Sequence, residues 1–182
     1  MKEYSGPIFF IVHGPYRNSI ADPKNNILSV KNRKRIIEML NKAGQRRIPV
    51  LYSPEITTAA AMKQDIEGTV ENILKFVKYK PRVIELTTFG FSSEEVSRVL
   101  KKQKIMPTQI TCAGYLRDHC VLQWAKAARE AFPKAKINIL AGASSVLMRQ
   151  ESSIPFEREK FAEKMRKASI KQVRKLTPRH FV

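Results

Sequence analysis

The chain has 182 residues, 43% of them hydrophobic and 27% charged, as is typical of one globular domain with a buried core. No apolar run approaches the roughly 20 residues that a membrane-spanning helix needs, and the two cysteines give no disulfide framework. We therefore expect a cytoplasmic protein with no transmembrane segment. Lysine and arginine (34 residues) outnumber aspartate and glutamate (16 residues), which gives a formal net charge of +18. This charge favours an acidic partner, such as nucleic acid, an anionic membrane or an acidic protein surface; the alternative is a solvated basic surface without a dedicated ligand.

Strand-like and helix-like segments alternate along the chain. Short apolar runs rich in β-forming residues predict five strands, at residues 7–12, 48–52, 82–86, 109–113 and 136–141. Apolar stripes at helical spacing predict the helices, at residues 30–40, 66–77, 94–104, 121–132 and about 156–176. Ser92 or Ser93 is expected to cap the third of these helices.

This alternation predicts one α/β domain over residues 1–182. Its three layers are α/β/α, with a central, mostly parallel sheet covered by helices on both faces. The helix at about 156–176 is expected to end the domain, followed by a short basic tail in which His180 is mobile.

Cys120 is the most specific chemical feature, because it follows a buried strand where a helix begins. In an open parallel sheet, ligands bind beyond the carboxyl ends of the strands. A thiol at a helix N-terminus has a lowered pKa, and the backbone N–H groups there can also hold an oxyanion. Cys120 is therefore a candidate nucleophile, the alternative being an inert packed cysteine. Cys112, inside the preceding strand, is expected only to pack.

The residues around Cys120 resemble a known family signature. Gly114, Asp118, Cys120 and Val121 match the Gly-Val-x-Thr-Asp-x-Cys-Val pattern of isochorismatase-like cysteine hydrolases. The resemblance runs from about Pro7 to Val173 and includes, in the family's order, residues 48–50, 91–100 and 141–145. It implies a sheet of about six parallel strands, Cys120 as the nucleophile, Leu116 and Cys120 as the oxyanion loop, and a homo-oligomer.

Two of the three catalytic positions implied by the resemblance hold other residue types. The aspartate that follows the family's first strand falls at His13, and the lysine falls at Glu85, with Lys80 as a poorly spaced substitute. The Asp-x-His metal ligands of the nicotinamidase branch are absent from residues 53–57. We therefore expect no metal and no cofactor.

Three interpretations follow. The site is a degenerate relic, and the chain is a basic binding or assembly protein for an acidic partner. Alternatively, Cys120 acts with His13 as base and Glu85 as the group that orients it, in a cysteine hydrolase of a small-molecule amide or enol ether. In the third, the chain is an ordinary family hydrolase whose catalytic residues align differently. The first interpretation is our prediction, and the second is its main alternative.

Overall fold

One parallel sheet forms the centre of the molecule. The computed structural model describes residues 3–12, 23–53, 73–86, 90–114, 117–144 and 154–181. Within these ranges the strands lie in the order β3-β2-β1-β4-β5-β6, and every neighbouring pair is parallel. The strands are β1 (Tyr4–Val12), β2 (Val50–Ser53), β3 (Val83–Glu85), β4 (Ile105–Gly114), β5 (Lys136–Ser144) and β6 (Lys171–Val173).

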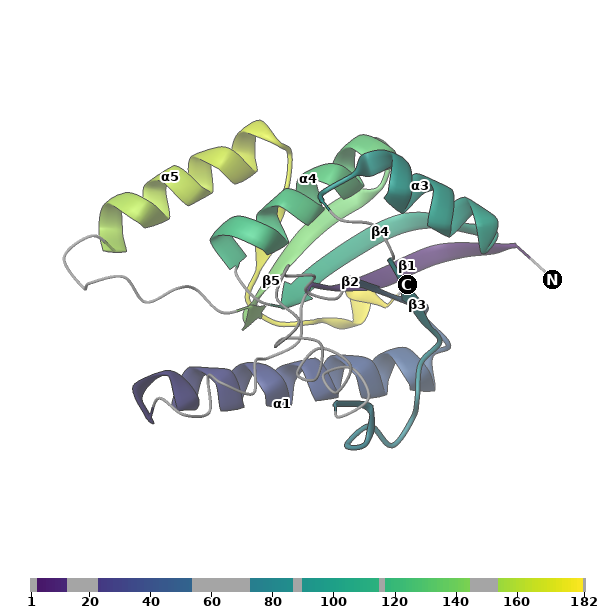
Figure 1. Cartoon of the computed structure of the whole chain (residues 1–182), viewed down its shortest axis with the longest axis horizontal. Helices are drawn as coiled ribbons and strands as arrows, with labels where there is room; N and C mark the ends of the chain where they lie inside the picture. The colour runs from purple at the N-terminus through teal and green to yellow at the C-terminus, as the bar shows by residue number, and fades with distance from the viewer. Residues whose placement is uncertain are drawn as a thin grey trace, which may run out of the picture.

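Helices cover both faces of this sheet. In the described ranges they are α1 (Pro23–Gln45), α3 (Ser93–Lys102), α4 (Leu122–Ala131) and α5 (Ile154–Lys167). Figure 1 shows α1 on one side of the sheet and α3, α4 and α5 on the other. The predicted three-layer α/β/α architecture is confirmed. Most of the helix predicted at residues 66–77 lies outside the described residues. In the part that is described, Ile73 and Leu74 are helical.

The inner strands β1, β2, β4 and β5 are largely buried on both faces, as continuous apolar runs in a parallel sheet require. Along β1, Ile8, Phe10 and Val12 pack into one cluster with side chains of α3, α4 and α5. Phe9 and Ile11, on the opposite face, pack into a second cluster with α1. We call these the α4-side cluster and the α1-side cluster.

Local capping agrees with the sequence prediction at α3. Ser92 is the N-cap, and its Oγ accepts a hydrogen bond from the backbone N–H of Glu95 at 3.1 Å. The buried Glu95 carboxylate also accepts two hydrogen bonds from Arg98, at 2.8 and 2.6 Å. This start of α3 lies beside the edge of the sheet where the strands end.

The last predicted helix, at about 156–176, is wrong at its C-terminal end. α5 ends at Lys167, and Ser169 takes a left-handed φ of 52° that turns the chain into β6. The apolar residues Ile170 and Val173, which fit the helical stripe, instead follow this turn and pack beside the sheet. The tail is packed at His180, which is 7% exposed and ends a 3₁₀ turn, Pro178–His180, capped by Thr177.

Candidate functional site

The carboxyl ends of the strands lie at one edge of the sheet, because all neighbouring pairs run in the same direction. β1 ends at Val12, β3 at Glu85 and β4 at Gly114. Ligands bind at this edge in folds of this class. Two of the predicted site residues, His13 and Leu116, lie outside the described residues, and their roles stay predictions.

The ends of β1 and β4 approach each other closely in the residues that precede Cys120. Gly114 has a φ of +129°, and a Cβ there would overlap the carbonyl oxygen of Val12 at the end of β1. Glycine is therefore required at the end of β4. The described chain resumes as a π-helical turn, Arg117–Val121, that continues directly into α4.

Cys120 is the fourth residue of this π-helical turn. Its side chain is partly buried and packs against the α4-side cluster. The N–H groups of a first helical turn have no partner within the helix, and π-helical turns are frequent at functional sites. Cys120 thus lies at the junction of β4 and α4, where a thiolate gains from the helix N-terminus.

Cys112 differs from Cys120 in burial and in its place in the fold. It is fully buried within β4, and burial raises the pKa of its thiol. A protonated, buried thiol is a poor nucleophile. Of the two cysteines, only Cys120 has the exposure that a reacting group needs.

Glu85 lies at the end of the edge strand β3. It pairs in register with Tyr52, and burial, together with the Glu85 charge, raises the pKa of the Tyr52 hydroxyl. Ile84 packs into the α4-side cluster, whereas Val83 and Tyr52 pack into the α1-side cluster. Because side chains alternate along a strand, Glu85 is on the α1 side of the sheet. The strands β2 and β1 separate β3 from β4, a lateral distance of about 14 Å at the usual strand spacing. The predicted role of Glu85 is to orient His13, which lies outside the described residues, so that role stays a prediction.

Aromatic rings extend from the core to the surface next to Cys120. The ring of buried Trp124 lies 5.3 Å from that of Phe10 and 5.4 Å from that of Phe91. Phe91 is 43% exposed, and its ring is 6.3 Å from that of the exposed His119. His119 therefore contacts an aromatic ring at the surface.

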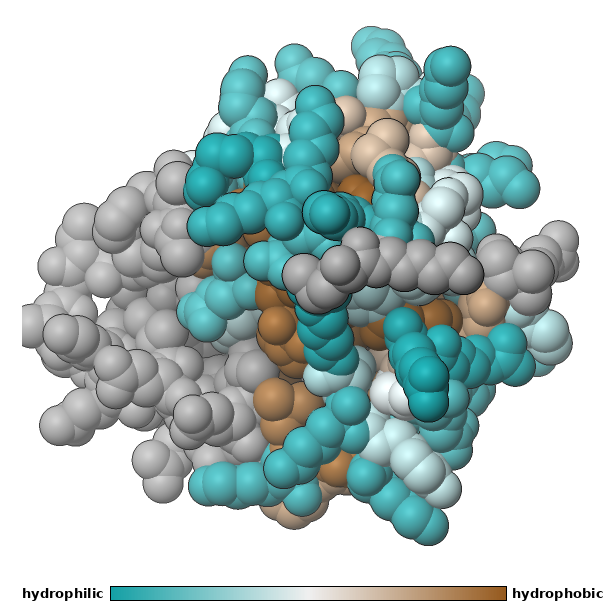
Figure 2. All heavy atoms as spheres, turned by 90° about the vertical axis from the view of Figure 1, so that its right-hand side faces the viewer, coloured by the Kyte–Doolittle hydropathy of each residue, from teal (hydrophilic) through white to brown (hydrophobic). Residues whose placement is uncertain are grey.

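A second feature lies on the α1 side, in the residues that precede β3. Phe76 and Tyr79 are 59% and 42% exposed, and Lys75, Lys78 and Lys80 beside them are exposed as well. We call these residues the Lys75–Lys80 segment. Figure 2 views the molecule from the right-hand side of Figure 1, where hydrophilic side chains cover most of the surface and hydrophobic areas show between them.

The Lys75–Lys80 segment is fixed to the C-terminal half of α1. The Oδ1 atom of Asn41 accepts hydrogen bonds from the backbone N–H groups of Lys78 and Tyr79, at 2.7 and 3.2 Å. Between the exposed residues, Val77 is 4% exposed and belongs to the α1-side cluster. The exposed aromatic and basic side chains thus project from a well-anchored backbone.

Sequence reasoning counted these basic residues but did not identify this surface. Lys78 and Asn41 are 37 residues apart, and no pattern in the sequence relates them. The available signal was the alternation of basic and aromatic residues from Lys75 to Lys80.

No family model and no curated protein matches the chain. Solved structures do. An isochorismatase from Pseudomonas putida KT2440 has a TM-score of 0.65 at 12% identity, covering 93% of this chain and 87% of that one. An octameric hydrolase of unknown specificity from Escherichia coli has a TM-score of 0.59 at 14% identity, with coverages of 93% and 74%. The MAR1 ribonuclease from Caenorhabditis elegans has a TM-score of 0.56 at 16% identity, with coverages of 96% and 76%.

These similarities show the fold. The chain is an α/β protein with the isochorismatase-like fold, as the resemblance around Cys120 implied. Within the part of the chain that the structure describes, no helix has the length and apolar character needed to cross a bilayer. Nor do three His, Cys, Asp or Glu side chains gather there as a metal site requires.

Proposed function

We propose that this chain binds an acidic partner, single-stranded nucleic acid, through the surface formed by the Lys75–Lys80 segment and the C-terminal half of α1. The observation that carries the proposal is the exposure of Phe76 and Tyr79, at 59% and 42%, between exposed lysines. Aromatic rings stack on unpaired bases, and lysines contact the phosphates between them. Arg46 and Arg47, which follow the C-terminal end of α1, are also exposed and add positive charge there.

The anchoring of this segment to α1 supports a binding role. Because Asn41 holds two of its backbone N–H groups, the backbone of the segment loses little conformational freedom when a partner binds. Preorganised groups bind more tightly because less entropy is lost on association. The excess of positive charge, +18 over the chain, would also accelerate the encounter with a polyanion.

The fold is compatible with this proposal. One similar structure, from Caenorhabditis elegans, is named a ribonuclease. The catalytic aspartate and lysine positions of the isochorismatase resemblance hold His13 and Glu85 in this chain. We therefore infer binding rather than the family's hydrolysis as the main role.

The test measures binding of a fluorescein-labelled, single-stranded RNA by anisotropy across a range of salt concentrations. Affinity is expected to fall steeply, with a log–log slope of about −0.7 for each phosphate neutralised. Phe76→Ala and Tyr79→Ala should each weaken binding by about 1–3 kcal/mol without changing the slope, whereas Lys78→Gln should reduce the slope by about 0.7. Met106→Ala is the matched control, since Met106 is 44% exposed and lies in β4 rather than in the segment.

Three results would count against nucleic acid. Salt-insensitive binding would exclude a phosphate-based interaction. Equal losses of RNA affinity in Met106→Ala and Phe76→Ala would show that the segment has no specific role in binding. Equally tight binding of polyglutamate would indicate an acidic protein surface as the partner instead.

A cysteine hydrolase is the second candidate, and the partly exposed Cys120 in its π-helical turn favours it. This proposal predicts that iodoacetamide labels Cys120 much faster than Cys112, with an apparent thiol pKa well below 8.5. If His13 is the base, His13→Ala raises that apparent pKa. Glu85→Gln tests the third residue. An unchanged apparent pKa of the Cys120 thiol in this variant would show that Glu85 is not part of the catalytic arrangement. Slow and equal labelling of both cysteines would refute the hydrolase.

We also propose a homo-oligomer, since one similar structure is described as an octameric hydrolase. Light scattering on the purified chain tests this assembly directly. A mass near 20.9 kDa, that of one chain, would contradict it.

A further inference from the structure

We propose that a pocket between α1 and the residues that follow β6 binds a phosphate group. This inference rests on the proposed function for its physiological source, a backbone phosphate of the bound nucleic acid. The chemistry of the pocket fits a phosphate-bearing small molecule equally well. The experiment below separates these two sources.

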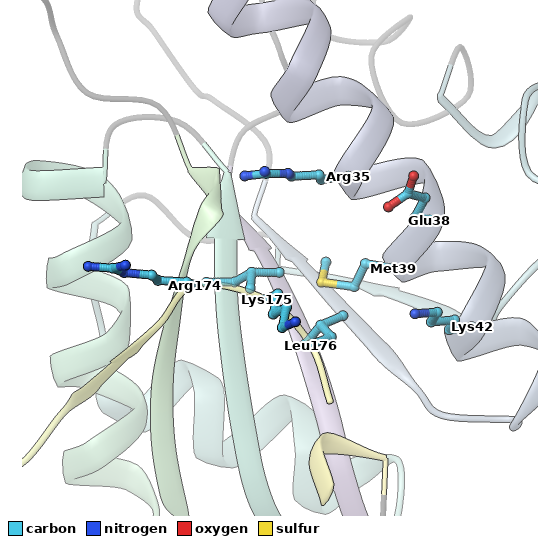
Figure 3. Close-up of a pocket in the computed structure, with 8 residues that line it drawn as sticks. Arg35, Glu38, Met39, Lys42, Arg174, Lys175 and Leu176 are labelled. Atoms are coloured by element: carbon cyan, nitrogen blue, oxygen red, sulfur yellow. The ribbon is translucent and has the colours of Figure 1, made fainter. Parts of the chain in front are cut away.

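The pocket is lined by one stripe of α1 together with β5 and the chain after β6. Its volume is about 150 Å³, and its lining residues are Arg35, Glu38, Met39, Lys42, Leu140, Arg174, Lys175 and Leu176. At about 30 Å³ for a water molecule, this space holds a phosphate group with its oxygens. Figure 3 shows Arg35 and Lys42 reaching from α1 toward the segment that contains Lys175, whereas Arg174 points away from α1.

Arg35 is already held in place without an anion. Its Nη1 atom donates a hydrogen bond to the carbonyl oxygen of Gly142 in β5, at 2.8 Å. A guanidinium group has five N–H donors in a fixed plane, so the others stay available. The Nζ atom of the exposed Lys42 lies 5.6 Å from the centre of the Phe181 ring, which is a weak contact at an exposed site. Arg35 is therefore positioned before a ligand arrives.

Among the residues that the structure describes, the lining of this pocket carries more positive than negative charge. Arg35, Lys42 and Lys175 face a single carboxylate, Glu38, and within the described ranges the ion pairs are Arg98–Glu95 and Lys167–Glu163, both elsewhere. Like charges brought together repel unless a counter-ion joins them. An anion with more than one negative charge would neutralise this site.

The lining favours phosphate over a carboxylate. The cations approach from α1 on one side and from the chain after β6 on the other, and several cations are better neutralised by a phosphate with two negative charges than by a carboxylate with one. The side chains of Met39, Leu140 and Leu176 form the apolar part of the lining. Apolar surroundings lower the local dielectric constant and strengthen charge–charge attraction.

The pocket and the Lys75–Lys80 segment lie on two flanks of the same part of α1. Lys42 lines the pocket, and the adjacent Asn41 holds the Lys75–Lys80 segment. A helix with its side chains is about 10–12 Å across, so a strand of a few nucleotides can span it. A phosphate in the pocket would then fix the strand while Phe76 and Tyr79 stack on its bases.

The experiment compares charge-matched variants with two probes, single-stranded RNA by anisotropy and inorganic phosphate by calorimetry. Arg35→Gln and Lys42→Gln each remove one positive charge from the pocket, and Lys101→Gln removes one from the exposed end of α3. We expect both pocket variants to lose phosphate binding and to bind RNA roughly tenfold more weakly than Lys101→Gln does. Thermal unfolding of each variant checks that it is folded.

Each outcome separates the inference from the proposed function. If RNA binds but the pocket variants match Lys101→Gln, the pocket is overturned and the proposed function stands. A different result is that RNA does not bind, while phosphate binds the wild-type chain but not the pocket variants. The phosphate site is then supported, its ligand is a small phosphate-bearing molecule, and the proposed function is overturned. If the wild-type chain binds neither probe, both are overturned.

Discussion

Gly44 provides a sharp test of the contact between α1 and the Lys75–Lys80 segment. It lies near the end of α1 (Pro23–Gln45), where replacing glycine by alanine usually stabilises a helix by up to about 1 kcal/mol. Here a Cβ would overlap the backbone carbonyl of Tyr79. We therefore predict that Gly44→Ala destabilises the protein, the opposite of its usual effect.

The magnitude follows from what must move. Overpacking a tight contact costs about 1–3 kcal/mol. If Tyr79 shifts to relieve the overlap, the hydrogen bonds from Lys78 and Tyr79 to Asn41 are weakened, at about 1 kcal/mol each. After the helix-propensity gain of up to about 1 kcal/mol is subtracted, the net loss is about 2–4 kcal/mol. For an m-value near 2 kcal/mol/M, the urea midpoint falls by about 1–2 M.

Urea unfolding followed by circular dichroism measures this shift. Gln45→Ala is the control, because Gln45 is exposed on the neighbouring position of α1 and surface substitutions usually change stability by less than about 0.5 kcal/mol. RNA affinity should fall in Gly44→Ala as the segment is displaced. An unchanged or higher midpoint for Gly44→Ala would refute the close approach between α1 and Tyr79.

Two further predictions concern pH and the C-terminal tail. Because burial raises the pKa of the Cys112 thiol, the unfolded state releases this proton first, so the contribution of Cys112 to stability is constant below the ordinary value of about 8.5 and falls at higher pH. Cys112→Ala should reduce that fall between pH 8.5 and 10 in urea titrations, and an identical pH profile would contradict the burial argument. Phe181→Ala removes a ring that lies 5.7 Å from Phe9 and 4.9 Å from the Arg46 guanidinium. We expect it to lower stability by roughly 1–2 kcal/mol in thermal unfolding; an unchanged melting temperature would mean that the tail is not docked.

The sequence predicted the sheet well because buried parallel strands are continuous apolar runs. β1, β2, β3, β4 and β5 all overlap the predicted strands. β6 was missed because three residues, Lys171–Val173, carry no recognisable strand pattern. Ile170 and Val173 continue the helical spacing of Phe161 and Met165, and neither glycine nor proline marks the turn at Ser169.

The candidate site could be predicted only as far as local pattern allowed. The step from a buried strand through Gly114 to a helix located Cys120, but the π-helical turn that holds it has no sequence signature. Glu85 was assigned by its spacing from Phe91, and spacing does not reveal which face of a sheet a residue occupies. The alternation of Val83 and Ile84 decides that face once the packing is known.

The basic surface could be counted but not located from the sequence. Its pocket joins Arg35 to Lys175, and its stacking surface joins Asn41 to Lys78. Both depend on contacts between distant segments. In addition, assigning residues 156–176 to one helix left no reason to place Lys175 beside α1.

The sheet separates the two candidate functions, and this separation is itself testable. Cys120 packs against the α4-side cluster, whereas the Lys75–Lys80 segment is anchored through Val77 in the α1-side cluster. Substitutions more than about 7–10 Å apart without shared partners act independently. We therefore predict that Cys120→Ala leaves RNA affinity within about twofold of wild type, and that Phe76→Ala leaves the rate of Cys120 alkylation unchanged. Loss of RNA binding in Cys120→Ala, with the fold intact, would show that nucleic acid reaches the β4–α4 junction, and the binding and hydrolase proposals would then describe one site.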